Sequence, residues 1–320
     1  MIKGFKISKG SDYFGKLVKH RDTYNDRGKY LGFKGIDEIY NMQLGTCTDW
    51  TGTPGSGKTQ VLMEMILNTS KYYGWKHLVY FPDVGTDIEI ISDLMHKLTG
   101  KTFNPKYNNT ISDDEIAQNL DFIFAHFFIM TKENTKAKMT PYEFWDYAVE
   151  LDNEIGIQTA CIDSWKDLNH DTSKFSRDDK YLEDVLSYRN DVAERNNLHL
   201  HTIIHPKLVA KENGKRPAPT PHDLKGGSEW FNNGKTMITV HRENPDGIEC
   251  QVIVNKAKPR SSGKKGFCTL EFDIAKLVYY EFESGGKQYA NQDKQINLVP
   301  FETPLRPNEG FENEITKAPF

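Results

Sequence analysis

The sequence predicts an α/β fold, in which helices flank a mainly parallel, twisted sheet that gains antiparallel strands on its C-terminal side. Over residues 46–205, short apolar runs bounded by turn residues alternate with longer segments of helical periodicity. This alternation is typical of parallel strands joined by crossover helices. Beyond residue 235 the runs become short and β-rich, and turn sequences such as "RENPDG" and "PRSSGKKG" separate them, which predicts antiparallel additions.

The predicted elements follow one another along the chain. Five buried parallel strands are expected at "TCTDWT", "HLVYFP", "FIFAHFFIM", "IQTACID" and "LHLHTIIH". Helices between them are expected at "KTQVLMEMILNTSKYYG", "DIEIISDLMHKLTG", "TPYEFWDYAVELDNEIG" and "DDKYLEDVLSYRNDVAERNN". Antiparallel strands are expected at "TMITVH", "ECQVIVN", "FCTLEFD" and "KLVYYEF". We therefore expect an N-terminal segment with an amphipathic helix (1–35), one large α/β domain (36–283), and a mostly disordered tail (284–320) rich in Gly, Asn, Gln and Pro.

Composition limits the class of protein. The chain has 320 residues, a net charge of -4 and 37% apolar residues, which argues against a uniformly basic nucleic-acid coat protein but leaves room for a local basic stripe. No run approaches the roughly 18 apolar residues of a membrane span. The four cysteines form no C-x-x-C pair, which favours a reduced, cytoplasmic protein without membrane contact; they are Cys47, Cys161, Cys250 and Cys268.

A phosphate-binding loop lies between the first predicted strand and the first predicted helix. The pattern G-x-x-x-x-G-K-[ST] is specific in this strand–turn–helix context, because glycines let backbone N–H groups surround phosphates at a helix N-terminus. Lys58 is expected to contact the β and γ phosphates of ATP or another NTP, and the Thr59 hydroxyl to ligate Mg²⁺. The predicted nucleotide-binding stretch is Gly52, Thr53, Pro54, Gly55, Ser56, Gly57, Lys58, Thr59 and Gln60.

Two acids are candidates for catalysis at the carboxyl ends of other strands. Asp163 follows the apolar run in "QTACIDSW", and is expected to complete the Mg²⁺ site; it could instead cap a helix. Asp83 in "FPDVG" is expected to orient the attacking water, although Pro-Asp-x-Gly is also turn chemistry. His205, at the end of "LHLHTIIH", is placed to sense the γ phosphate. A zinc site is disfavoured, because His199 and His201 share a face near the other end of this strand.

The ordered set of motifs resembles the RecA-type motor domain of DnaB-like replicative ring helicases, and most closely their phage and mitochondrial Twinkle-type branch. The resemblance covers about residues 10–283. It is carried by "GFKGIDEIY", "TGTPGSGKT", "YFPDVG", "CIDSWKDLNH", "IIHPK", "DLKGGSEWFNN", "TVHRENPDG" and "KPRSSGKKG". It implies a RecA-like P-loop NTPase that hydrolyses ATP to unwind DNA during phage-type replication.

The resemblance also implies roles for further residues. Asp83 matches the family's catalytic Glu with a side chain one carbon shorter, which puts its role in question, and His205 matches the γ-phosphate sensor. In "KPRSSGKKG", Arg260 matches an arginine finger given to the neighbouring subunit, with Lys258 as its partner; the reverse assignment, with Lys258 as finger and Arg260 on DNA, stays open. Arg242 and Phe272 match positions that stack on the nucleotide base.

The implied partners are single-stranded or forked DNA and five further copies in a homo-hexamer. Lys225, Gly226, Gly227 and Ser228 match the family's DNA-binding loop, and Lys207 and Lys235 flank it in the same basic segment. The amphipathic segment "DYFGKLVKHRDTY" is expected to act as a linker helix between subunits, although a helix packed in its own domain is also compatible. The acidic tail, which ends in Phe320, is a candidate docking segment for a polymerase, primase or single-strand-binding protein.

Relatives imply 5′ to 3′ travel, and a phage-encoded chain would work in the cytoplasm of its bacterial host. Three alternatives stay open at this point. A RecA-like recombination or repair ATPase would bind single strands without unwinding, and a packaging or partition motor would act on duplex DNA. A nucleotide-gated adaptor would bind ATP without turnover if Asp83 does not position water.

Overall fold

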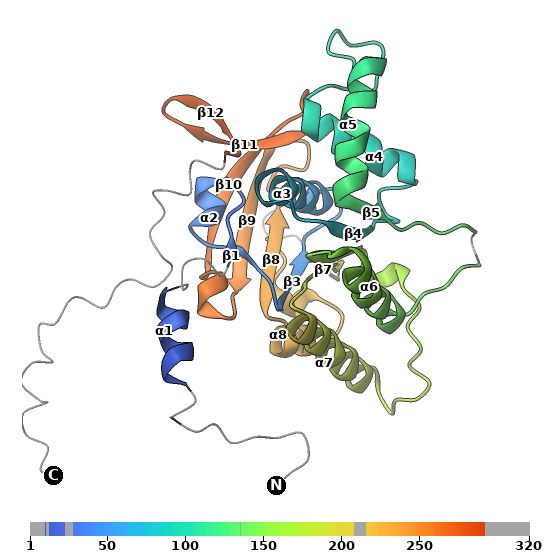
Figure 1. The fold of residues 1–320 in the computed structure, drawn as a ribbon, viewed down its shortest axis with the longest axis vertical. Coiled ribbons are helices and arrows are strands. Elements are labelled where there is room, and N and C mark those ends of the chain that lie inside the picture. Colours follow the sequence, from blue (N-terminus) through green and yellow to red (C-terminus); the bar gives the residue numbers. More distant parts are fainter. Residues whose placement is uncertain (1–9, 11–12, 23–27, 135, 208–215, 292–320) are drawn as a thin grey trace, which may run out of the picture.

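The computed structural model describes residues 10, 13–22, 28–134, 136–207 and 216–291. Their centre is a ten-stranded sheet with the order β12-β11-β10-β9-β8-β3-β7-β6-β4-β5 (Figure 1). The strands from β8 to β5 in this order are parallel. They are β3 (Thr46–Thr51), β4 (His77–Tyr80), β5 (Phe127–Ile129), β6 (Thr159–Asp163), β7 (His199–Ile203) and β8 (Thr236–His241). This α/β architecture confirms the predicted fold class.

Helices cover both faces of the parallel part. One apolar cluster packs α3 and α4 against the sheet together with Ile123 of α5, and a second packs α6, α7 and Trp230 of α8 against the opposite face. The helices are α3 (Lys58–Tyr73), α4 (Asp87–Thr99), α5 (Asp113–His126), α6 (Pro141–Ile155), α7 (Asp178–Asn196) and α8 (Gly227–Asn233). Among the described residues, no helix combines the length and apolar character that crossing a membrane requires.

Local sequence explains where several helices begin. At α4, α5 and α6 a Ser or Thr accepts a hydrogen bond from the backbone N–H three residues later, and the Glu there bonds back to the cap residue. Each of these capping boxes satisfies two otherwise unpaired N–H groups. The box Ser112–Glu115 also explains a correction. The segment "FIFAHFFIM" was predicted to be a strand, but its first half completes α5, and only Phe127–Ile129 is extended.

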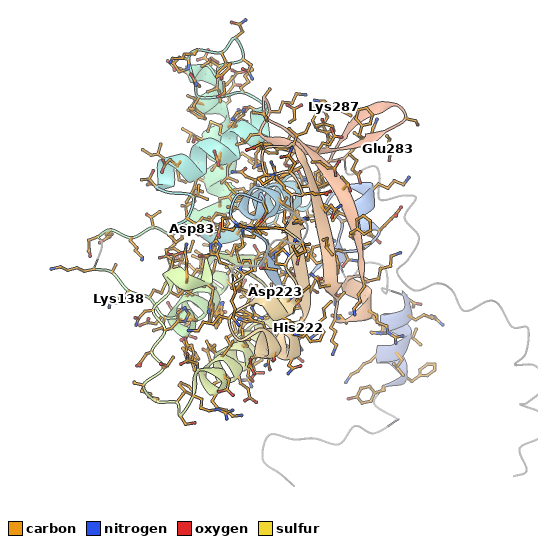
Figure 2. The ribbon with its side chains drawn as sticks, turned by 180° about the vertical axis from the view of Figure 1, so that it is seen from behind. Asp83, Lys138, His222, Asp223, Glu283 and Lys287 are labelled. Carbon is orange, nitrogen blue, oxygen red and sulfur yellow. The ribbon has the colours of Figure 1, made fainter. Side chains whose placement is uncertain are left out.

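The antiparallel part is formed by β9 (Glu249–Lys256), β10 (Gly266–Asp273), β11 (Val278–Glu283) and β12 (Gly286–Tyr289). β8 was predicted to belong here, yet it runs parallel to β3, with Thr48 opposite Thr236. The chain reaches it through α8, which returns the chain to the start of the sheet. Figure 2 shows Glu283 and Lys287 on the β11–β12 hairpin, away from Asp83.

The domain extends beyond both predicted boundaries. β1 (Gly28–Lys29) pairs with β2 (Met42–Gln43), and Leu31 and Phe33, which precede α2 (Lys34–Asp37), are buried in the core. The tail was predicted to begin at residue 284, but β12 continues the sheet to Tyr289; residues 292–320, including Phe320, lie outside the described residues. α1 (Phe14–Asp22) has no buried residue and lies beside the main body (Figure 1).

Candidate nucleotide-hydrolysis site

The phosphate-binding loop connects β3 to α3 at the carboxyl edge of the parallel sheet. Gly57 precedes α3 with a φ of 92°, and a Cβ atom there would lie 2.5 Å from the Tyr279 hydroxyl, so only glycine fits. Lys58 Nζ donates hydrogen bonds to the carbonyls of Gly52 and Thr53, at 3.0 and 3.1 Å. The Ser56 hydroxyl is buried and has no hydrogen-bond partner among the described residues. A loop with spare buried donors and a lysine at a helix N-terminus fits a phosphate chain.

Asp163 and Thr59 supply oxygen atoms beside this loop. Asp163 ends β6 and is 1% exposed, and Thr59 Oγ1 donates a hydrogen bond to its carboxylate. Burial raises the pKa of Asp163, although the Thr59 hydroxyl opposes this. Burial likewise lowers the pKa of Lys58, while Asp163 acts in the opposite direction. A hydroxyl and a carboxylate are hard oxygen ligands of the kind that Mg²⁺ prefers, so these residues fit the predicted metal.

Asp83 follows β4, the neighbour of β6 in the sheet, and three of its contacts define its position. Its backbone N–H donates to the Asp163 carbonyl at 3.4 Å, His205 Nε2 donates to Oδ2 at 2.9 Å, and Lys166 Nζ lies 3.1 Å from Oδ1. Partial burial raises the pKa of Asp83, but the His205 and Lys166 contacts outweigh it, so the net pKa is lowered. The carboxyl group is therefore ionised near neutral pH.

Asp83, Asp163 and His205 come together although long stretches of sequence separate them. One ligand atom from each lies within 4.8 Å of the others. They meet because each follows a parallel strand, and the carboxyl ends of such strands lie along one edge. Lys166 was not predicted. Its signal in the sequence was its position three residues after Asp163, in the turn Trp165–Asp167, which returns its side chain toward the neighbouring strand end.

A cavity of about 580 Å³ extends from the loop along β8 and β10. Arg242 and Phe272 both line it, as predicted for residues that contact a base. They also contact one another, because the Arg242 guanidinium carbon lies 5.7 Å from the Phe272 ring centroid. Ile248 and Ile274 add exposed apolar surface to the same wall; sequence reasoning missed both, since isolated apolar residues in turns carry no pattern.

His199 and His201 belong to the core rather than to a metal site. His199 Nδ1 donates to the Gln43 carbonyl, its Nε2 lies 2.9 Å from the Thr48 hydroxyl, and Trp50 Nε1 donates to His201 Nδ1 at 3.1 Å. Burial lowers the pKa of His199 to about 4, so the ring is neutral. His205 lies away from this pair, among the described acids.

Arg260 and Lys258 lie outside this chain's own cavity. β9 runs antiparallel to β8, so its last residue, Lys256, pairs with Met237 near the beginning of β8. Residues 258–262 therefore follow at the amino edge of the parallel strands, opposite the phosphate-binding loop. Both side chains are exposed, and Lys264 N–H donates to the Ile39 carbonyl, which ties the segment to the turn before β2.

The predicted DNA-binding residues separate into two groups. Lys207 follows β7, and the stretch Lys225–Ser228 leads into α8; the antiparallel bridge between Pro206 and Leu224 joins the two. Lys225 Nζ lies 3.6 Å from Asp178 of α7. The structure does not bring Lys235 together with them, because it precedes β8 at the opposite edge of the sheet.

The chain is similar to proteins that carry ring-helicase motors. It is 24% identical over 284 residues, 82% of the chain, to the Twinkle homolog protein, chloroplastic/mitochondrial, of Arabidopsis thaliana, and the match spans 38% of that protein's length. The solved structure of a DnaB-like helicase ATPase domain superposes with a TM-score of 0.69 at 16% identity, covering 86% of this chain and all of that domain. A DnaB-like replicative helicase, solved to describe its interactions with primase, superposes with a TM-score of 0.66 at 15% identity, covering 86% of this chain and 67% of that one.

No protein-family model matches the chain. The structural likeness establishes the ATPase-domain fold of DnaB-like helicases. Together with the Twinkle homologue, it confirms the resemblance that the motifs had indicated.

Proposed function

We propose that this chain is the ATP-hydrolysing motor of a DnaB-like ring helicase, which moves along single-stranded DNA and unwinds the duplex during replication. One observation carries the proposal. The phosphate-binding lysine, the Thr59–Asp163 pair and the Asp83–His205 pair surround a single cavity at the carboxyl edge of the sheet. These are the parts that phosphoryl transfer to water requires.

The geometry assigns each residue a task. The phosphates lie against the loop and Lys58, which exchanges its bonds to the Gly52 and Thr53 carbonyls for phosphate oxygens. Thr59 and Asp163 would hold Mg²⁺, which neutralises charge on the phosphates when bound. The ionised Asp83 accepts a hydrogen bond from the attacking water and orients it, and His205 couples this carboxylate to the γ phosphate. Asp83 performs this task with a shorter side chain than the family's Glu.

The site is incomplete within one chain, and this supports a ring. No cationic finger among the described residues reaches the cavity from Arg260 or Lys258, which lie at the opposite edge of the sheet. A neighbouring copy that presents its Arg260 would supply the charge that offsets phosphate charge in the transition state. α1 exposes Phe14 (77%) and Leu17 (60%), which suits a linker helix that packs on an adjacent subunit of a hexamer.

DNA contact is assigned to Lys207 and to the stretch Lys225–Ser228. Both lie on the same edge as the hydrolysis site, so a change of nucleotide state reaches them directly through β7 and His205. Travel from 5′ to 3′, a phage-type replisome in the bacterial cytoplasm, and recruitment of a polymerase, primase or single-strand-binding protein are further parts of the proposal that rest on the similar proteins.

Strand displacement tests the proposal. The substrate is a fork with 5′ and 3′ single-stranded tails, incubated with ATP and Mg²⁺, and Lys58→Ala is the inactive control. We expect displacement that requires the 5′ tail and is absent in the variant. DNA-stimulated hydrolysis without displacement, together with strand exchange, would instead favour a recombination ATPase.

Subunit mixing tests the shared site. Arg260→Ala is expected to bind ATP but lose DNA-stimulated hydrolysis, and Asp163→Ala is expected to lose hydrolysis in its own site. In a ring formed from both variants, some interfaces combine an intact Asp163 with an intact Arg260. Partial recovery of activity is therefore expected, and absence of any recovery contradicts a finger given in trans. Lys258→Ala, mixed in the same way, identifies which cation is the finger.

A further inference from the structure

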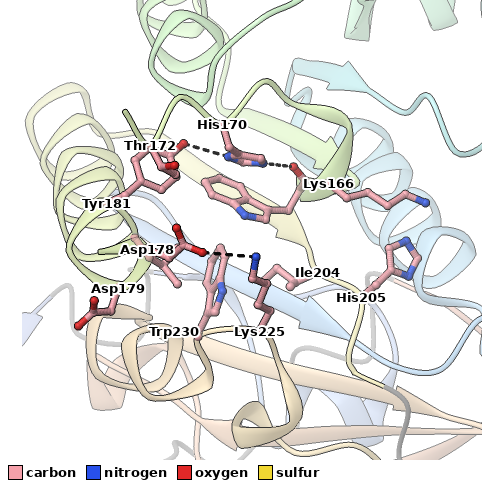
Figure 3. A pocket seen from close by; sticks show the side chains of 13 residues that line it. Lys166, His170, Thr172, Asp178, Asp179, Tyr181, Ile204, His205, Lys225 and Trp230 are labelled. Atoms are coloured by element: carbon pink, nitrogen blue, oxygen red, sulfur yellow. Dashed lines mark hydrogen bonds and ion pairs between the residues drawn. The ribbon is translucent and has the colours of Figure 1, made fainter. Parts of the chain in front are cut away.

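A second cavity, of about 530 Å³, lies beside the hydrolysis site (Figure 3). Its apolar walls come from Trp165 after β6, Leu182 of α7, Ile204 after β7 and Trp230 of α8. Leu182, Ile204 and Trp230 are almost completely buried, whereas Trp165 is partly exposed. A concave, mainly apolar space of this size with a few polar groups at its mouth has the properties of a small-molecule site.

The walls are held in place before any ligand binds. The Trp165 and Trp230 rings meet edge to face at 5.2 Å, and His170 lies 4.6 Å from Trp165 on its other side. His170 also bonds to the Trp165 carbonyl at 2.8 Å and to the Tyr181 hydroxyl at 2.9 Å. A ligand that enters this space loses little affinity to rearrangement of the protein.

Two side chains connect this cavity to the hydrolysis site. His205 lines both cavities, and Lys166 lines this one while its Nζ lies 3.1 Å from Asp83. Figure 3 shows Lys166 and His205 together on the side away from Asp178 and Asp179. An occupant near Lys166 therefore lies one contact from the carboxylate that orients water.

The charges at the mouth identify the occupant. Lys225 lies between Asp178 and Ile204, and with Lys166 it supplies cations for an anionic backbone (Figure 3). Asp178 and Asp179 on the α7 side repel phosphates and can accept hydrogen bonds from a base edge. Lys225 is also one of the residues assigned to DNA. A flat, largely apolar ring attached to a phosphate backbone matches this arrangement, whereas an acidic peptide would meet the two acids.

We infer that the cavity between Trp165 and Trp230 is a subsite for one unpaired base of single-stranded DNA. The backbone phosphates on either side of this base lie near Lys225 and Lys166. This inference rests on the proposed function, because it requires that the chain bind a single strand. It adds a contact to the base itself, whereas the proposed function requires only contacts to the backbone.

The test compares thymine oligonucleotides with abasic oligonucleotides of equal length and charge. Affinity is measured by fluorescence anisotropy of labelled strands, with a non-hydrolysable ATP analogue present. Two variants fill the cavity from different walls, Leu182→Trp and Thr172→Trp, and Ile88→Trp adds the same ring at a position on α4 that is 73% exposed. If Leu182→Trp does not fold, as judged by circular dichroism, the half-exposed Thr172→Trp decides.

We expect the unmodified protein and Ile88→Trp to prefer the thymine strand by about 5- to 150-fold, the range of a base stacked on aromatic groups. Both cavity variants should lose this preference and bind the abasic strand as the unmodified protein does. A preference that survives in both variants, or a variant that weakens both strands equally, overturns the base subsite but leaves DNA binding intact. If neither strand binds to any form of the protein, the proposed function fails as well.

Discussion

Substitution of Arg242 tests whether the wall beside Phe272 recognises the nucleotide base. Arg242 Nη1 donates to the Gly247 carbonyl at 2.7 Å, which orients the guanidinium plane, and its central carbon lies 5.7 Å from the Phe272 ring centroid. Both residues line the nucleotide cavity. Arg242→Ala removes a planar cation from the wall while the phosphate-binding loop stays in place.

The expected magnitude follows from this geometry. A guanidinium over an aromatic ring contributes about 0.5–2 kcal/mol, depending on its exposure, which corresponds to a roughly 2- to 30-fold loss of ATP affinity. Arg242→Lys is the matched variant, because it keeps the charge and removes the plane that stacks. It should lose part of the ATP affinity and none of the affinity for the phosphates.

Competition against a fluorescent ATP analogue measures these affinities, with ATP and inorganic tripolyphosphate as competitors. We expect Arg242→Lys to bind ATP more weakly and tripolyphosphate as before. If both competitors weaken equally in Arg242→Ala and neither weakens in Arg242→Lys, Arg242 acts on phosphate through its charge, and the assignment to the base is wrong.

Three further predictions concern stability and the metal. Arg189→Met should lower the free energy of unfolding by about 3–5 kcal/mol in urea titrations, because it leaves Asp49 buried without its cation; adding Asp49→Leu should recover most of this, and a double variant less stable than the single one contradicts the reasoning. Burial lowers the pKa of His77 to about 3 and of His199 to about 4, so the unfolded chain takes up protons first as pH falls below about 6.5. Stability should therefore drop on acidification, and His77→Gln should reduce the slope between pH 6 and 4 by about 1.4 kcal/mol per pH unit; an unchanged slope argues against a neutral His77. Asp163→Asn should raise the Mg²⁺ concentration needed for half-maximal phosphate release by about 10-fold or more, and an unchanged Mg²⁺ dependence removes Asp163 from the metal site.

Local sequence was sufficient wherever the chemistry depends on neighbouring residues. The phosphate-binding loop from Gly52 to Thr59 is contiguous, and the strand before it and the helix after it are each set by their own apolar pattern. The same holds for Asp163, because an acid that follows a buried parallel strand necessarily lies at the carboxyl edge. The motif order added the relation to DnaB-like helicases, which the solved ATPase domains confirm as a fold.

Tertiary structure decided what depends on pairing between distant segments. β8 has the length and composition of an antiparallel strand, and only its position beside β3 makes it parallel. The contact of Lys166 with Asp83 and the separation of Lys235 from Lys225 also follow from strand order. A single strand's own pattern reports which residues are buried, whereas its neighbours are chosen by the packing of the whole sheet.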